Sequence, residues 1–89
     1  MTLPFPVYER VKEFILQEIT IHGAISIGHL LERGLERFKD EHKDNTGIIL
    51  YYVKLDLETR GLIQSITVND HTRRPEVRLV RPTREATLL

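Results

Sequence analysis

The stretch Leu57-Glu58-Thr59-Arg60-Gly61-Leu62-Ile63, followed by residues 64–80, carries the strongest architectural signal in this chain. Before Gly61 the apolar residues recur at helical spacing, and after it they alternate with polar residues. A glycine at this change of period is typical of a helix end, and the pattern beyond it predicts a β-hairpin. We therefore expect paired strands over residues 62–68 and 76–81, joined by a turn-rich segment that ends at Pro75.

Three segments before the hairpin have helical periodicity. The spacing predicts helices over residues 7–21, 27–41 and 46–60. Ser26 suits the N-cap of the second helix, Gly23 suits the end of the first, and Ala24-Ile25 could form a minor strand between them. The expected core stripes are Val7, Val11, Phe14, Ile15 and Ile19 in the first helix, Ile27, Leu30, Leu31, Leu35 and Phe38 in the second, and Ile49, Leu50, Val53 and Leu57 in the third.

Length and composition bound the class of protein. A chain of 89 residues, 40% of them hydrophobic, makes one domain over residues 1–89, with a core over about 7–81 and a C-terminal tail over 82–89. It contains no cysteine, so disulfides and thiolate metal sites are excluded. No apolar run approaches the roughly 20 residues of a membrane span, and the start does not read as a signal peptide. A cytoplasmic location and no membrane partner are expected.

The net charge is zero, with 13 basic and 13 acidic side chains. A strong nonspecific polyanion binder usually has a basic excess, so the total disfavours that class. The charges are unevenly distributed, because residues 71–89 carry five basic and two acidic groups. Any positive field therefore lies on the hairpin and the tail, although a solvated charged strand explains the same pattern.

The order of elements resembles the winged-helix family, in which three helices precede a two-stranded antiparallel hairpin called the wing. The resemblance spans about residues 7–81 and implies an α+β fold. Residues 57–63 are similar to the family's ending of the third helix, and residues 25–31 resemble its entry into the second. One difference is the polar segment 39–45, which we expect to make the second helix longer than in a compact helix-turn-helix.

The resemblance implies binding of double-stranded DNA, with the third helix in the major groove and the wing on phosphates or in the minor groove. A domain of this size would then act as a dimer, since one copy reads few base pairs. Carried over to this sequence, the candidate DNA-binding residues are Tyr51, Lys54 and Thr59 on the third helix, His71, Arg73 and Arg74 in the turn, and Arg78 and Arg81 along the last strand.

A second hypothesis is a protein-interaction or dimerisation module that does not bind DNA. Base edges are read mainly by Arg, Lys, Asn and Gln, and the presumed groove face of the third helix offers only one basic group, Lys54. Opposite its core face it carries Ile48, Tyr52 and Leu55, and an exposed apolar strip often marks a partner surface. We expect this strip to be covered by protein, through self-association or a partner. Coverage by residues 2–5 or by Leu88-Leu89 of the same chain is the alternative.

Catalytic and metal sites are not indicated. Asp40, His42 and Asp44 alternate in one polar segment and His29 lies thirteen residues before His42, but these positions match no ligand motif. The sequence has no phosphate-binding loop, nucleophile elbow or dinucleotide fingerprint. We therefore expect no enzyme activity, no metal and no cofactor, and the target of either binding hypothesis is not readable from the sequence.

Overall fold

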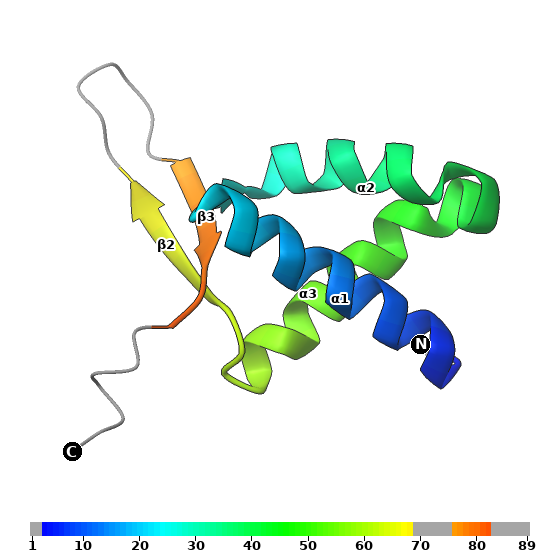
Figure 1. Cartoon of the computed structure of the whole chain (residues 1–89), viewed down its shortest axis with the longest axis horizontal. Coiled ribbons are helices and arrows are strands. Elements are labelled where there is room, and N and C mark those ends of the chain that lie inside the picture. Colours follow the sequence, from blue (N-terminus) through cyan, green and yellow to red (C-terminus); the bar gives the residue numbers. More distant parts are fainter. Residues whose placement is uncertain (1–2, 69–75, 83–89) are drawn as a thin grey trace.

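The computed structural model describes residues 3–68 and 76–82. Three helices pack together and a small sheet lies at one end of them (Figure 1). The elements in chain order are α1 (Phe5–His22), β1 (Ile25–Ser26), α2 (Ile27–His42), the 3-10 turn η1 (Lys43–Asn45), α3 (Thr46–Thr59), β2 (Gln64–Val68) and β3 (Glu76–Val80). The expected α+β order of three helices followed by paired antiparallel strands is confirmed, and it is compatible with a winged-helix arrangement.

The helix ends follow local sequence signals. Gly23 closes α1 with φ of 77°, and its N–H donates to the carbonyl of Ile19 at 2.7 Å. Gly61 has the same φ and follows α3. This left-handed conformation strains any residue that has a Cβ, which explains the glycines. At the start of α2 the hydroxyl of Ser26 accepts a hydrogen bond from the His29 N–H at 3.1 Å, so the predicted N-cap is formed.

The connection between α2 and α3 is short. Helix α2 continues through His42, and only the three residues of η1 separate it from α3. A turn of three or four residues is typical of helix-turn-helix units. The polar segment 39–45 therefore lengthens α2 and does not create a long loop.

The hydrophobic core lies between the three helices and the sheet. Ile49, Leu50, Val53 and Leu57 of α3 are all buried, as predicted from the helical period. Gly34 of α2 faces Leu50, and a Cβ at position 34 would lie 3.0 Å from Leu50 Cδ2. Helix α3 therefore packs closely against α2 at this glycine. Leu35 was wrongly assigned to the core, since its side chain is 47% exposed.

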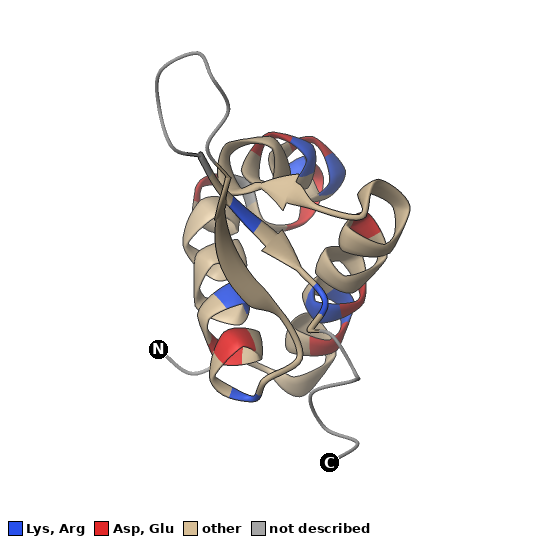
Figure 2. Ribbon diagram, turned by 90° about the vertical axis from the view of Figure 1, so that its left-hand side faces the viewer, with Lys and Arg blue, Asp and Glu red and all other residues tan. Residues whose placement is uncertain are grey.

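The sheet has the strand order β1-β3-β2, and both pairings are antiparallel. Strand β3 is central, with Leu79 in register with Ile25 on one side and with Ser65 on the other. The side chains of Ile25 in β1, of Leu79 in β3 and of Ile63 just before β2 are buried, so the sheet closes one end of the core. Figure 2 shows that the coloured charged positions lie mainly on the helices and the sheet is largely uncharged. Among the described residues, no helix is long and apolar enough to cross a membrane.

Candidate interaction surface

The exposed side of α3 carries the apolar strip predicted from the sequence. Ile48, Tyr52 and Leu55 are 57%, 37% and 43% exposed, on the side of the helix opposite its core face. They border an open hollow of about 620 Å³, which we call the α3 groove. Its lining residues are Leu31, Asp44, Gly47, Ile48, Tyr51, Tyr52 and Leu55. Large apolar side chains exposed in one place are characteristic of binding surfaces.

The structure describes only part of the two segments, residues 2–5 and Leu88-Leu89, that were considered as a cover for the strip within one chain. Leu3 is half-buried, but it lines a different hollow, between α1 and α3. Phe5 is 72% exposed and does not line the α3 groove. Thr2, Leu88 and Leu89 lie outside the described residues. Coverage of the strip by a partner or a second copy stays a prediction.

Lys54 does not lie on the exposed face, and our placement of it there was wrong. The residue is 7% exposed, and its Nζ forms an ion pair with Glu58 Oε1 at 2.7 Å. Position 54 follows Leu50 by four residues, about 40° around the helix, so it lies at the edge of the core face. Its ammonium also lies 5.1 Å from the ring centroid of Tyr51. A buried, paired lysine is poorly placed to read a base.

The Lys54–Glu58 pair extends to the sheet. The hydroxyl of Ser65 in β2 donates to Glu58 Oε2 at 2.5 Å. Burial raises the pKa of the Glu58 carboxyl, but the hydrogen bonds from Lys54 and Ser65 outweigh it, so the pKa is lowered overall. The cation expected in a DNA groove therefore joins α3 to β2 and has a structural role.

The other candidate DNA-binding residues are spread over two elements. Tyr51 and Thr59 are exposed on α3, and the Thr59 hydroxyl donates to the carbonyl of Leu55 at 3.0 Å. Arg78 is half-buried in β3, in register with Ile66 and Ser26, and Arg81 is exposed just after that strand. His71, Arg73 and Arg74 lie outside the described residues. DNA binding by this set stays a prediction.

A second hollow, of about 320 Å³, lies between α1 and α3 and shares Tyr52 with the α3 groove. Because Tyr52 lines both hollows, they adjoin each other beside α3.

Three polar residues that line this second hollow are bonded to one another. The Tyr8 hydroxyl donates to Asp56 Oδ2, and Arg60 Nε also donates to that oxygen at 2.7 Å. Burial and the hydrogen bond to Asp56 raise the pKa of Tyr8 to about 12. The same bonds from Tyr8 and Arg60 lower the pKa of Asp56.

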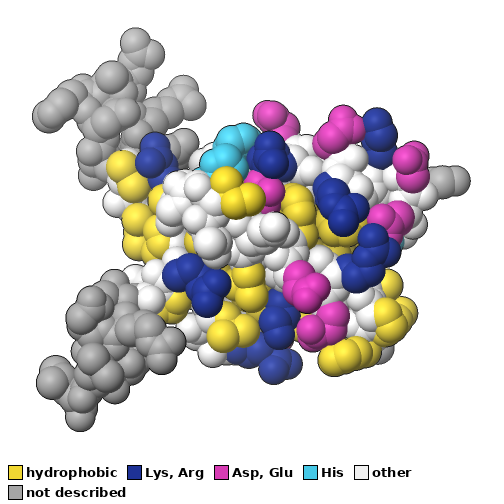
Figure 3. All heavy atoms as spheres, viewed as in Figure 1, with side chains coloured by type: hydrophobic (Ala, Val, Ile, Leu, Met, Phe, Trp, Pro, Cys, Tyr) yellow, Lys and Arg dark blue, Asp and Glu magenta, His cyan; other side chains and the backbone are white. Residues whose placement is uncertain are grey.

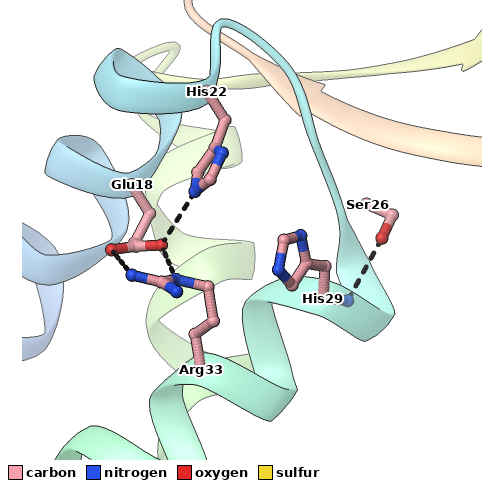
Figure 4. A network of polar contacts seen from close by, with 5 residues as sticks. All are labelled: Glu18, His22, Ser26, His29 and Arg33. Atoms are coloured by element: carbon pink, nitrogen blue, oxygen red, sulfur yellow. Dashed lines mark hydrogen bonds and ion pairs between the residues drawn. The ribbon is translucent and has the colours of Figure 1, made fainter.

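A polar cluster between α1 and α2 was not found from the sequence (Figure 4). Glu18 is 5% exposed, and Arg33 donates to its carboxylate through Nε and through Nη2, the latter at 3.2 Å. His22 Nε2 lies 3.4 Å from Glu18, and the rings of His22 and His29 are 5.4 Å apart. Glu18, His29 and Arg33 border a cleft of about 650 Å³. The sequence did contain one indication that Glu18 is buried. Glu18 follows Val11 by seven residues and so falls on the apolar stripe of α1.

The basic side chains of the helices are largely paired with carboxylates. Arg10 Nη2 contacts Glu41 Oε2 at 2.8 Å, and Lys39 contacts Glu36 at 2.8 Å. Accordingly, on the face of the molecule drawn in Figure 3, basic and acidic side chains are interleaved over the helices. Within residues 3–68 and 76–82, no group of three or more His, Asp or Glu is arranged to hold a metal ion.

These features define a small α+β domain with an apolar groove along its third helix. The chain belongs to the DUF6958 family, a family of unknown function, whose sequence model matches residues 6–73. The matched region runs from α1 through β2 and includes the α3 groove. No curated protein and no solved structure shows significant similarity to the chain.

Proposed function

We propose that this protein is a winged-helix-like protein-interaction module that binds an amphipathic helix in the α3 groove. One observation carries the proposal, namely the composition of the exposed side of α3. Ile48, Tyr51, Tyr52 and Leu55 are exposed there, whereas the single lysine of the helix is buried against Glu58. An element that reads DNA has the opposite arrangement, with its cations exposed.

The form of the groove supports a helical occupant. It is built mainly by α3, with Leu31 of α2 and Asp44 of η1 beside it, so it runs along a helix axis. A groove of this kind takes the apolar face of a partner helix, with anchor residues at positions i, i+3 or i+4, and i+7. Gly47 lines the groove, and a Cβ at this position would meet no neighbouring atom within 4 Å. A partner helix can therefore approach the backbone of α3 closely there.

A displayed library of amphipathic helical peptides, panned against the immobilised protein at nanomolar concentration, tests the proposal. We expect enrichment of peptides with apolar residues at the spacing given above. These peptides should lose binding to Leu55→Asp and keep it for Ile21→Asp, because Ile21 is an exposed apolar residue of α1 that lies in the α1–α2 cleft. Equal binding to both variants, or no enrichment, contradicts the proposal.

DNA binding is the second candidate, favoured by the five basic and two acidic groups of residues 71–89. A pool of labelled duplex DNA titrated over a salt series tests it, since counterion release makes such binding fall steeply with salt. Under this candidate the double variant Arg73→Ala, Arg74→Ala lowers affinity broadly and reduces the salt slope by about one unit per lost phosphate contact. No binding by the wild type at low salt excludes it.

We also propose a cytoplasmic location for this protein. Fractionation of cells that express a tagged chain tests this. Recovery in the membrane or secreted fraction contradicts it.

A further inference from the structure

We infer that the partner in the α3 groove is a second copy of this chain, with the two α3 helices packed antiparallel about a two-fold axis near Tyr51 and Tyr52. This inference rests on the proposed function and specifies its occupant. It draws on the spacing of the exposed residues, on the charges around the groove and on the extent of the surface.

The spacing makes the strip self-complementary. Ile48 and Leu55 lie seven residues apart, about 10 Å along the helix, and the two tyrosines lie midway between them. In an antiparallel pair centred on the tyrosines, Ile48 of one copy faces Leu55 of the other, and the reverse holds at the opposite end. A two-fold interface requires this reciprocity of contacts. A strip with one apolar end and one polar end would not provide it.

The charges permit the same arrangement. Of the seven described residues that line the groove, Asp44 alone is charged, and it stands just before the start of α3. Antiparallel packing places the Asp44 carboxylates of the two copies at opposite ends of the interface, about two helix turns or more from each other. Like charges brought together across an interface disfavour that register. Parallel packing would place like charges at the same level.

The number of residues on the α3 groove and the adjoining hollow indicates how tightly two copies should associate. The groove has seven lining residues and the adjoining hollow has nine, with Tyr52 common to both, which makes fifteen in all. A standard stable interface uses about 20–30 residues a side. We therefore expect a reversible dimer with a dissociation constant in the micromolar range, on the order of 1–100 μM.

Sedimentation equilibrium over a concentration series that brackets the micromolar range tests the dimer. The wild type should pass from monomer to dimer. Leu55→Asp should weaken dimerisation by at least about a hundredfold, because each two-fold interface contains two copies of the substituted residue. Ile21→Asp should dimerise as the wild type does. Circular dichroism shows that both variants are folded before they are compared.

Disulfide trapping tests the orientation, since the chain has no cysteine of its own. Mixing Ile48→Cys with Leu55→Cys under mild oxidation should give a cross-linked heterodimer in preference to either homodimer. Tyr52→Cys should cross-link to itself, and Ile21→Cys should not. Preferential homodimers of Ile48→Cys and of Leu55→Cys indicate parallel packing and overturn the proposed arrangement.

The dimer and the proposed function fail in different ways. A wild type that stays monomeric throughout the series, while helical peptides still bind the groove, overturns the second copy as occupant and leaves the interaction module in place. A monomer that binds no helical peptide overturns both.

Discussion

Replacing Gly34 by alanine should destabilise the contact between α2 and α3. A Cβ at position 34 would overlap Leu50 Cδ1 and would lie 3.0 Å from Cδ2 and 3.2 Å from Cγ. Because Cγ is also close, turning the terminal methyl groups of Leu50 does not clear the contact. Leu50 is 1% exposed and fixed in the core, so the two helices must move apart or the leucine must change its rotamer.

The expected loss combines two opposing effects. Overpacking a well-filled core costs about 1–3 kcal/mol. Alanine in place of glycine in a helix interior returns about 1 kcal/mol. The net expectation is a fall in the free energy of unfolding of up to about 2 kcal/mol, and each kcal/mol lowers the Tm of a domain of this size by roughly 4–8 °C.

Gly28 of α2 supplies the matched control. A Cβ there has nothing within 4 Å, so Gly28→Ala should be neutral or stabilise by up to about 1 kcal/mol. Urea unfolding of both variants beside the wild type measures the difference, which isolates the clash. In a Leu50→Ala background the substitution Gly34→Ala should no longer destabilise, since its contact partner is gone. A Gly34→Ala variant as stable as Gly28→Ala would refute the close helix contact.

Three further predictions concern polar groups. Glu18→Gln should lower the free energy of unfolding by about 1 kcal/mol, because it weakens the pair between the buried Glu18 and the exposed Arg33, whereas exposed Glu13→Gln should be neutral in the same urea titration. Tyr8 has a pKa of about 12 in the folded chain and about 10 when unfolded, so its stabilisation is fully present below pH 10 and is lost as the pH rises through 12. Unfolding measured from pH 9 to 12 should show this loss in the wild type, and Tyr8→Phe should remove that part of the slope. Ser26→Ala should cost about 1 kcal/mol by thermal unfolding, and an unchanged Tm would argue against the N-cap.

The sequence by itself determined the order and approximate bounds of the elements. The apolar period of about 3.6 residues marks each helix, and the change to a period of two after Gly61 marks the strands. Both signals are local, because a residue's place in its own helix or strand depends on near neighbours in the chain. The exposure of Ile48, Tyr52 and Leu55 followed from the same periodicity, which is why the apolar strip was predictable.

Only the tertiary structure decided which polar side chains are buried and with what partner. The Glu18–Arg33 pair joins residues 15 positions apart, and the Tyr8–Asp56 hydrogen bond joins residues 48 apart. Lys54 is buried because Glu58, and through it Ser65 of β2, satisfies its charge at the edge of the core. Such pairs depend on how the helices and the sheet approach one another, and no local spacing records that approach. The same packing brings Leu31 of α2 beside α3 and so turns an exposed strip into a groove.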